Sequence, residues 1–401
     1  MYTQKLKEES PMKYSNQIFG VPKEIMENEN RVALDPSAVK KLVDQGATVW
    51  IETNAGMGSM FTNEDYLAVG AIIKDDVKEI FDGADVILKV KEPQFNKNLN
   101  THEMDMLHKG QKLITFLHPA TPSNHDTIRK LAADGIIAIT LDGIPRITRA
   151  QAMDPLTSMS TVAGYKGMLM AANLSPIFMP MIGTAVGIIK PGKVLVVGAG
   201  VSGLQAIATA KRLGAEVTSI DIRPDAAEQG TSLGAKNFDV GVPAELALGE
   251  GGYALQLSDE WLEKERTKME EILYDQDVII LTALVPGKVA PILITNDMMP
   301  KLKDGAVIVD ISIDQGGNCA ATTPGEITKV GNVTVIGTKN IPGSVPQSAT
   351  WMFAQNMVNL LELVYTTGEF NLDMNDVIIQ QALVTNDGEI VHTGTLEAMG
   401  R

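Results

Sequence analysis

The sequence has few of the residues that cross-link a protein or bind metal ions. Cys319 is the only cysteine among 401 residues, so no internal disulfide can form and a secreted disulfide scaffold is excluded. The five histidines, at positions 102, 108, 118, 125 and 392, show no HxxxH-like spacing, so we expect no metal site. The length predicts two domains.

Basic residues are also scarce. Lys and Arg number 34 against 49 Asp and Glu, which gives a formal net charge of −15. Nucleic acids and anionic membrane surfaces bind basic protein faces, so we expect neither as a partner. The first 17 residues are polar and contain no apolar signal core, and we interpret them as a loose extension.

One uncharged run, between Lys166 and Lys190, is long enough to span a bilayer. Pro176 and Pro180 interrupt it, and prolines break a helical hydrogen-bond ladder. The run also leads directly into a strand, a glycine-rich loop and a helix. We therefore favour a buried helix over residues 157–174, followed by a covered loop, over a transmembrane segment.

Apolar runs alternate with helical patterns along the whole chain, which predicts an α/β fold with parallel sheets covered on both faces. We expect two doubly wound, Rossmann-like domains, one formed by residues 1–145 with 340–401 and the other by 146–339. Two long helices, at about 154–174 and 347–366, are expected to cross between them and to join them. Predicted strands lie at 19–21, 47–51, 84–90, 113–118, 136–141, 193–197, 215–220, 277–281, 306–310 and 333–336.

The strongest motif is GAGVSG, residues 198–203, which fits GxGxxG. It follows the apolar run KVLVV and opens a predicted helix, which is the context that binding of a dinucleotide requires. Gly198 permits the tight turn, Gly200 lets the backbone approach a pyrophosphate, and Gly203 allows close helix–strand packing. The motif identifies 146–339 as the predicted NAD-binding domain.

Asp221 stands at the end of the next predicted strand. A carboxylate there accepts hydrogen bonds from ribose hydroxyls and repels a 2′-phosphate, so we predict NAD(H) rather than NADP(H). Arg223 either covers the adenine ring or holds a phosphate, and we favour the first because Asp221 precedes it.

Several motifs then resemble one group of enzymes: the alanine dehydrogenases and the NAD(H)-binding component of proton-translocating nicotinamide nucleotide transhydrogenase. The resemblance runs from about Phe19 to the C-terminus. It rests on GVPKE…NRVALDP (20–36), NAGMGSMFTNEDYLAVGA (54–71), KVKEP (89–93), LVPGKVAP (284–291) and DISIDQGG (310–317).

Other stretches resemble the transhydrogenase branch. PRITRAQAMDPLTS (145–158) is similar to the loop around the nicotinamide end of NAD, which implies that Arg146, Gln151 and Asp154 position the nicotinamide. GGYA (251–254) resembles a closing loop, with Tyr253 over the nucleotide. The cofactor-binding set that we predict is Arg146, Ile147, Thr148, Gln151, Gly198, Gly200, Val201, Gly203, Asp221, Ile222, Arg223, Gly252, Tyr253 and Leu284.

The transhydrogenase resemblance implies hydride transfer from NADH on this chain to NADP⁺ on a partner, coupled to proton translocation. The implied partners are the membrane-spanning second portion of the alpha subunit, an NADP-binding beta subunit and a second copy of this chain. Its location would be cytoplasmic, peripheral on the inner membrane. The length fits the separate first portion of the alpha subunit.

Two alternatives stay open. Alanine dehydrogenases use an Arg, a Lys, a His and an Asp, and the matching positions here are Arg31, Lys91, His118 and Asp314. The chain would then convert L-alanine and NAD⁺ to pyruvate and ammonia, although Pro119 departs from the dehydrogenase pattern. The other alternative is a non-catalytic NAD(H)-sensing protein.

Overall fold

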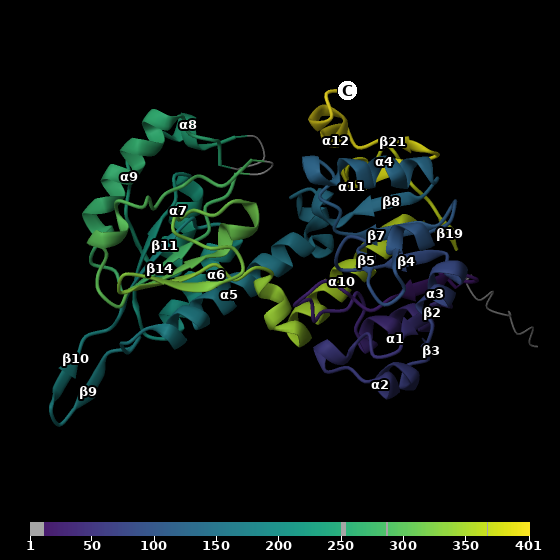
Figure 1. Ribbon diagram of the computed structural model, residues 1–401, viewed down its shortest axis with the longest axis horizontal. Coiled ribbons are helices and arrows are strands. Elements are labelled where there is room, and N and C mark those ends of the chain that lie inside the picture. Colours follow the sequence, from purple (N-terminus) through teal and green to yellow (C-terminus); the bar gives the residue numbers. More distant parts are fainter. Residues whose placement is uncertain (1–11, 250–253, 286–287, 367) are drawn as a thin grey trace, which may run out of the picture. The chain divides into compact units, whose positions relative to one another are not determined.

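The computed structural model describes residues 12–249, 254–285, 288–366 and 368–401 (Figure 1). The chain divides into two compact units. Unit 1 comprises Met1–Ser158 and Pro346–Arg401, and unit 2 comprises Met159–Val345. Helix α5 (Pro155–Leu174) begins in unit 1 and continues in unit 2, whereas α10 (Pro346–Val364) lies wholly in unit 1. The expectation that both long helices cross between the domains therefore holds for α5 and is wrong for α10.

The division also falls later in the chain than the expected one at 145/146. The reason is packing, because residues 148–153 lie on α10 and are therefore part of unit 1. The predicted nicotinamide loop thus belongs to unit 1, while the glycine motif belongs to unit 2.

Unit 1 contains a sheet of eight described strands. They are β1 (Ile18–Val21), β2 (Thr48–Glu52), β3 (Ile72–Lys74), β4 (Val86–Leu88), β7 (Lys112–Thr115), β8 (Ile137–Thr140), β20 (Leu383–Asn386) and β21 (Glu389–Ile390). Their order is β21-β20-β8-β7-β4-β1-β2-β3. The six strands from β8 to β3 are parallel, and β20 and β21 join them antiparallel. The chain therefore winds outward in both directions from β1, as in a doubly wound fold.

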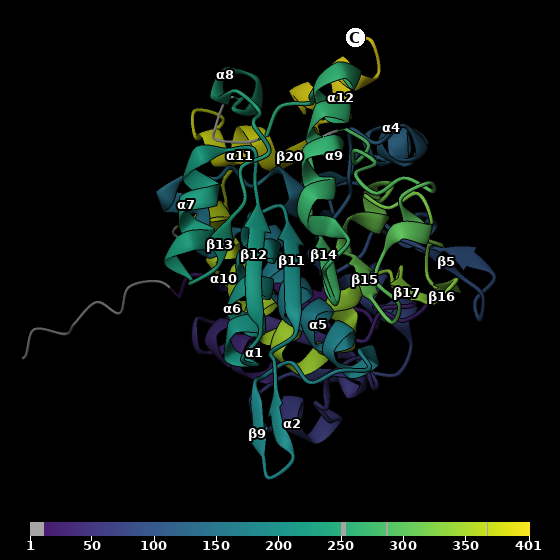
Figure 2. The same cartoon turned by 90° about the vertical axis from the view of Figure 1, so that its left-hand side faces the viewer.

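Unit 2 contains a second sheet of seven described strands. They are β11 (Lys193–Val197), β12 (Glu216–Ile220), β13 (Lys236–Asn237), β14 (Val278–Leu281), β15 (Val307–Asp310), β16 (Ile327–Val330) and β17 (Val333–Ile336). Figure 2 shows them side by side in the order β13-β12-β11-β14-β15-β17-β16. All pairs are parallel except β16 with β17. The direction of winding reverses between β11 and β14.

Both faces of the unit 2 sheet are covered. Val194 and Val196 of β11 pack in one cluster with residues of α5, α6 (Val201–Arg212) and α7 (Pro224–Ser232). Leu195 and Val197 point to the opposite face and pack with residues of α9 (Asp259–Leu273). Because successive strand residues point to opposite faces, the unbroken apolar run KVLVV fits a strand buried on both sides.

Helices in unit 1 begin where the sequence predicts a start. Helix α1 (Pro36–Asp44) is capped by Asp35, whose carboxylate accepts a hydrogen bond of 3.0 Å from the Ala38 backbone N–H. The chain leaves α1 through Gly46 at φ +92°. The other helices of unit 1 are α2 (Asn63–Ala68), α3 (Val77–Gly83), α4 (His125–Ala133), α11 (Val377–Ala382) and α12 (Thr393–Ala398).

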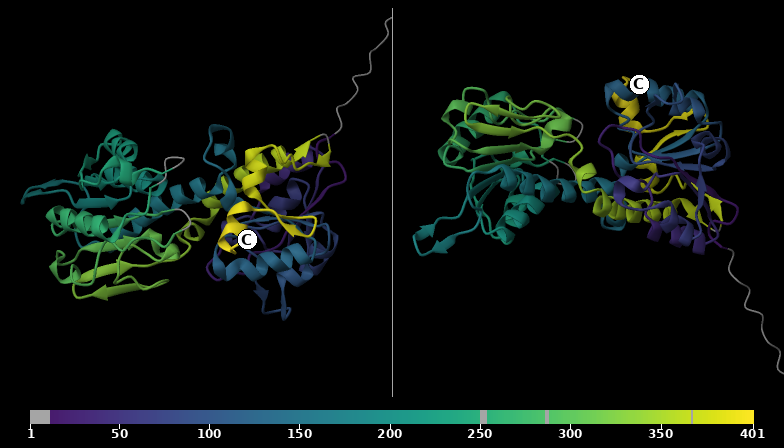
Figure 3. Two further views of the ribbon diagram at one scale, coloured as in Figure 1. Left: turned by 90° about the horizontal axis from the view of Figure 1, so that it is seen from above. Right: turned by 60° about the horizontal axis from the view of Figure 1, so that its bottom comes forward.

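Two local expectations are wrong. Residues 12–17 are not loose, because Tyr14 is fully buried and packs edge-on against Phe19 and Tyr365. Residues after α5 do not form a covered loop. They form a hairpin of β9 (Ile182–Thr184) and β10 (Gly187–Ile189), which projects from the rest of unit 2 (Figure 1 and Figure 3).

No helix in the described residues is long and apolar enough to cross a membrane. Helix α5 ends at Leu174, before Pro176 and Pro180, the two prolines that were expected to break a helix in the uncharged run.

A buried charge cluster joins neighbouring strand ends in unit 1. The Nζ atom of Lys89, after β4, lies 3.3 Å from a Glu24 carboxylate oxygen and 3.1 Å from one of Glu103. The other oxygens of the two acids accept hydrogen bonds from the backbone N–H groups of Val90 and Gln94. Burial raises the pKa of Glu24 to about 7, although Lys89 opposes the rise. One cation thus holds two buried acids.

We expect Lys89→Met to lower the free energy of unfolding by about 3–5 kcal/mol, because it leaves Glu24 and Glu103 buried without their cation. Lys40→Met is the control: Lys40 forms an exposed pair with Asp44, and its loss should cost less than about 1 kcal/mol. Urea denaturation of both variants measures the difference. Equal losses would contradict a structural role for the cluster.

Candidate dinucleotide site

The glycine motif forms a tight turn between β11 and α6. Gly198 has φ +91°, which disfavours any residue with a Cβ. A Cβ on Gly203 would lie 1.8 Å from the Gly198 carbonyl oxygen. Both positions therefore need glycine for the backbone to pack, and the turn brings the start of α6 close to the end of β11.

Gly200 has a different environment. A Cβ there would meet only the Arg223 Nη2 atom, at 3.8 Å, among the described residues. Gly200 is also the N-cap of α6 and offers no side chain to the N–H groups of the first turn. Unsatisfied N–H groups and the helix dipole favour an anion at this position. The open space in front of Gly200 therefore fits a pyrophosphate.

Two polar residues outside the predicted set support this turn. Thr282, after β14, donates a hydrogen bond of 2.7 Å to the Gly198 carbonyl oxygen. Asn318 is buried, accepts from the Ala283 N–H and donates to the Ala283 and Pro291 carbonyl oxygens. It thereby anchors the segment that carries the predicted residue Leu284, which is 36% exposed. A polar residue directly after a buried apolar run was the signal for Thr282.

Asp221 lies at the end of β12, on the same edge of the sheet. Its carboxylate accepts hydrogen bonds from Ala199 N, Arg223 N, Arg223 Nε and Arg223 Nη2, at 2.7, 2.8, 3.0 and 2.7 Å. A carboxylate has about four acceptor positions, so this set uses all of them. A ribose hydroxyl can reach Asp221 only if Arg223 yields part of its pairing. Ile222, between them, packs against the core.

The predicted nicotinamide loop is held firmly within unit 1. Its central residues form a 3₁₀ helix, Thr148–Met153. The Ala152 carbonyl oxygen accepts hydrogen bonds of 2.9 Å from both Asn356 and Asn359 of α10. Arg149 forms a two-bond ion pair with Asp376, at 2.6 and 2.7 Å.

The loop presents its predicted residues to the surface. Arg146, Ile147, Thr148 and Gln151 are all exposed. Among the described residues, no hydrogen bond engages the Gln151 side chain, which leaves its amide able to bind a ligand.

Asp154 has a structural task that we did not predict. Its carboxylate accepts hydrogen bonds from the Thr157 N–H and hydroxyl, at 3.0 and 2.6 Å, and so caps the start of α5. We expected Asp154 to hold Arg146 or Gln151. In the described part of the chain it makes no side-chain hydrogen bond to Gln151.

Three of the four dehydrogenase-like residues follow neighbouring strands of unit 1. Arg31 comes after β1 and forms a buried ion pair with Glu29, whose Oε1 accepts from Arg31 Nε at 2.7 Å. Burial opposes ionisation of Glu29, but the hydrogen bonds and charge of Arg31 lower its pKa. Lys91 comes after β4. Because the strands are parallel, these residues share one edge of the sheet.

His118 comes after β7 and is half exposed. Its ring stacks on Phe116, with 5.9 Å between ring centres, and its Nδ1 atom lies 3.6 Å from an Asp142 carboxylate oxygen. Asp314 belongs to unit 2, where it is exposed.

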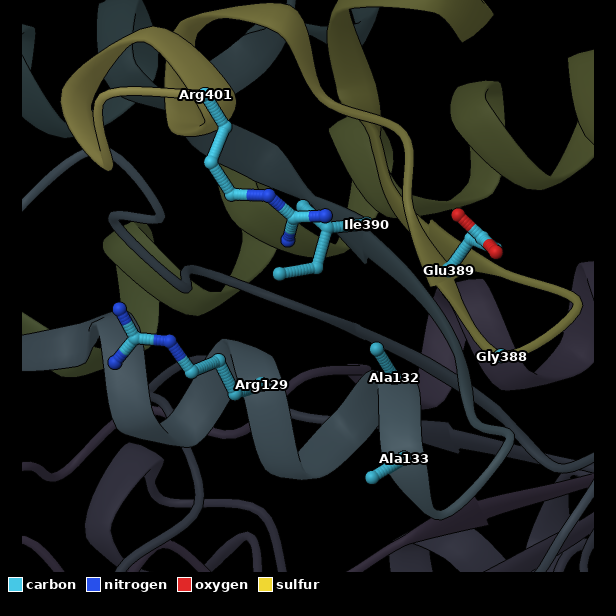
Figure 4. A pocket seen from close by; sticks show the side chains of 7 residues that line it. All are labelled: Arg129, Ala132, Ala133, Gly388, Glu389, Ile390 and Arg401. Atoms are coloured by element: carbon cyan, nitrogen blue, oxygen red, sulfur yellow. The ribbon is translucent and has the colours of Figure 1, made fainter.

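Two predicted residues, Gly252 and Tyr253, lie outside the described residues. A separate small pocket in unit 1 is lined by residues of α4, the β20–β21 turn and the C-terminus (Figure 4). It contains none of the predicted site residues.

A doubly wound sheet, a glycine turn beside its reversal point and an acid at the next strand end together define a dinucleotide-binding α/β protein. The alanine dehydrogenase/PNT N-terminal domain matches residues 20–163, and the alanine dehydrogenase/PNT C-terminal domain matches residues 167–393. The chain belongs to the alanine dehydrogenase/PNT family.

Relatives come from both branches. The first portion of the NAD(P) transhydrogenase alpha subunit of Rhodospirillum rubrum, a separate chain, is 39% identical over 93% of this chain and 97% of that protein. Alanine dehydrogenase of Staphylococcus saprophyticus is 31% identical over 95% of this chain and 96% of that protein. A solved transhydrogenase from Sinorhizobium meliloti is 36% identical with a TM-score of 0.81, covering 94% of this chain and 100% of that one.

The two inner glycines give a matched pair of variants. Gly200→Ala should weaken NADH binding severalfold with little change in stability, because the added methyl enters open space where the pyrophosphate would lie. Gly203→Ala should lower the free energy of unfolding by about 1–3 kcal/mol, because its methyl meets the Gly198 carbonyl. Titration calorimetry and thermal denaturation measure the two effects. A stable Gly200→Ala protein with full NADH affinity would contradict the assignment.

Proposed function

We propose that this chain is the NAD(H)-binding component of a proton-translocating transhydrogenase. It passes hydride from its NADH to NADP⁺ held on a partner chain, and membrane-spanning partners couple that transfer to proton movement. The transhydrogenase relatives and the 145–158 loop support this function.

The observation that carries the proposal is the way in which this loop is held. Asn356, Asn359 and Asp376 fix its backbone and Arg149, while the Gln151 amide remains exposed and without a hydrogen bond among the described residues. Hydride transfer between two nicotinamide rings needs no acid or base from the protein. It needs ring placement, with the reacting atoms about 3–3.5 Å apart. A rigid loop with one exposed amide suits placement of a ring.

NAD(H) is the nucleotide that we assign to this chain, and NADP(H) belongs to the partner. Gly200 and the start of α6 receive the pyrophosphate, and Asp221 receives the ribose hydroxyls once Arg223 moves aside. The displaced Arg223 guanidinium then covers the adenine ring.

We further propose that the chain is a homodimer held by the β9–β10 hairpin. Val186 at its tip is 98% exposed and Ile188 is 74% exposed. Apolar side chains gathered on a projecting hairpin are costly in water, and a second copy of the same hairpin would cover them. Association with the membrane would come through the partner subunits.

Alanine dehydrogenase remains the second candidate, because Arg31, Lys91 and His118 follow three neighbouring parallel strands. A substrate carboxylate would have to share Arg31 with Glu29, which already binds it within a buried pair.

Gln151→Ala should keep near-normal NADH affinity and lose most hydride transfer. The pyrophosphate and ribose contacts lie elsewhere, whereas a ring displaced by about 1 Å can lose about a hundredfold in rate. Stopped-flow transfer to a nicotinamide analogue on the NADP-binding partner, together with NADH titration, separates the two effects. Gln381→Ala, an exposed glutamine of the same unit, is the control.

Two results would reject this function. Loss of NADH binding with unchanged transfer per bound nucleotide would make Gln151 a binding residue only. Strong alanine-dependent reduction of NAD⁺ that disappears in His118→Ala would identify an alanine dehydrogenase instead.

Replacing Val186 and Ile188 together by Glu should convert the dimer to a monomer, because paired hairpins would then bury like charges. Light scattering after size exclusion gives the mass, and Ile72→Glu, which alters an exposed apolar residue of unit 1, should leave the dimer intact. A hairpin variant that stays dimeric would assign the interface to another surface.

A further inference from the structure

Helix α9 carries a carboxyl group where its packing pattern calls for an apolar side chain. The buried residues of α9 are Glu265, Met269 and Leu273, spaced four apart along the face toward the sheet. Glu265 is 6% exposed. In the part of the chain that the structure describes, no hydrogen bond or ion pair engages its carboxyl group. Buried acids without partners are costly, so this one calls for an explanation.

Glu265 lies beside the ribose end of the dinucleotide site. Leu262 and Met269, its neighbours on the same helix face, pack in one cluster with Ile220 and Ile222, which flank Asp221 in the sequence. The charge of Asp221 also acts on Glu265. A second acid is therefore buried within electrostatic reach of the acid that the motif predicts.

The pairing of Asp221 gives the second acid its importance. Asp221 and Arg223 form a close ion pair, so together they carry no net charge. A neutral pair repels a 2′-phosphate weakly, and Arg223 attracts one. Discrimination against NADP(H) therefore needs a negative charge that Arg223 does not cancel.

We infer that Glu265 is a specificity-determining residue, whose uncompensated carboxylate makes the ribose end of this site reject a 2′-phosphate. This inference rests on the proposed function, because it deepens the assignment of NAD(H) to this chain. Glu265 acts through the electric field at the site and needs no contact with the nucleotide.

The surrounding charges make this rejection depend on pH. Burial, and then the charge of Asp221, raise the pKa of Glu265 to about 7, while Arg266 opposes the rise. Arg266 itself pairs with Glu263. From the neighbouring segments, Arg223 faces Asp221, and Asp239 is exposed after β13. Glu265 is thus largely neutral at pH 6 and largely ionised at pH 8.

The remaining charged residues of α9 lie on its exposed face, where water screens them. Lys264 pairs with Glu260 and Lys268 with Glu271. Glu271 therefore offers a control of equal charge on the same helix.

The test measures the ratio of the dissociation constants for NADP⁺ and NAD⁺ at pH 6 and pH 8, by titration calorimetry of the full chain. Glu265→Gln should lower this ratio at pH 8 by about tenfold, the scale of one charge interaction at a partly buried site. The variant should change the ratio little at pH 6. Glu265→Asp should keep most of the discrimination, and Glu271→Gln should match the wild type.

The 2′-phosphate also loses a proton near pH 6. That ionisation is common to every variant, so comparison between variants isolates the contribution of Glu265. A purely structural role would alter the thermal stability of Glu265→Gln without changing the ratio.

The outcomes separate this inference from the proposed function. If the wild type binds NADP⁺ as tightly as NAD⁺, the cofactor assignment itself fails. If the wild type prefers NAD⁺ and Glu265→Gln retains the same ratio at both pH values, the assignment stands and the role of Glu265 is wrong.

Discussion

The close approach of two backbone segments at Gly198 and Gly203 is the constraint on which unit 2 depends. With no Cβ on Gly203, α6 can start against the Gly198 carbonyl, and Thr282 bonds to the same oxygen from the next strand of the sheet. This contact places the first turn of α6 at the edge where β11, β12 and β14 end. The open face of Gly200, the carboxylate of Asp221 and the Asn318 anchor then share that edge. A methyl group at Gly203 would separate these elements, whereas one at Gly200 would disturb only what binds there.

Buried charges show two different uses of the same chemistry. In unit 1, Lys89 lies between Glu24 and Glu103, and backbone N–H groups satisfy their remaining oxygens, so the cluster joins neighbouring strand ends. In unit 2, Arg223 satisfies Asp221 while Glu265 has no such partner among the described residues. Low polarity strengthens both arrangements and makes an unpaired group costly. The paired cluster serves stability, and the unpaired acid is the one with a field left to act on a ligand.

Much of the fold could be predicted because its signals are local. The run KVLVV matches β11 residue for residue, and Asp35-Pro36 begins α1. The errors have a common cause. Tyr14 lies in a polar segment but is buried by Phe19 and Tyr365, and the apolar residues around Val186 lie in the open. Amino-acid type predicts burial on average, but a single segment is buried or exposed according to what packs on it. The length of α10 likewise did not reveal which unit it belongs to.

The sequence by itself determined the α/β class, the glycine turn and the acid at the next strand end, because each depends on residues close together in the chain and on backbone geometry that few residue types allow. Tertiary structure decided the state of the predicted site. Arg223 occupies the acceptor positions of Asp221, Asp154 caps α5, and two asparagines of α10 hold the loop that carries Gln151. It also brought Glu265 near Asp221, from a helix whose sequence reads as an ordinary charged surface helix. Such pairings join residues distant in sequence, so only the folded chain can specify them.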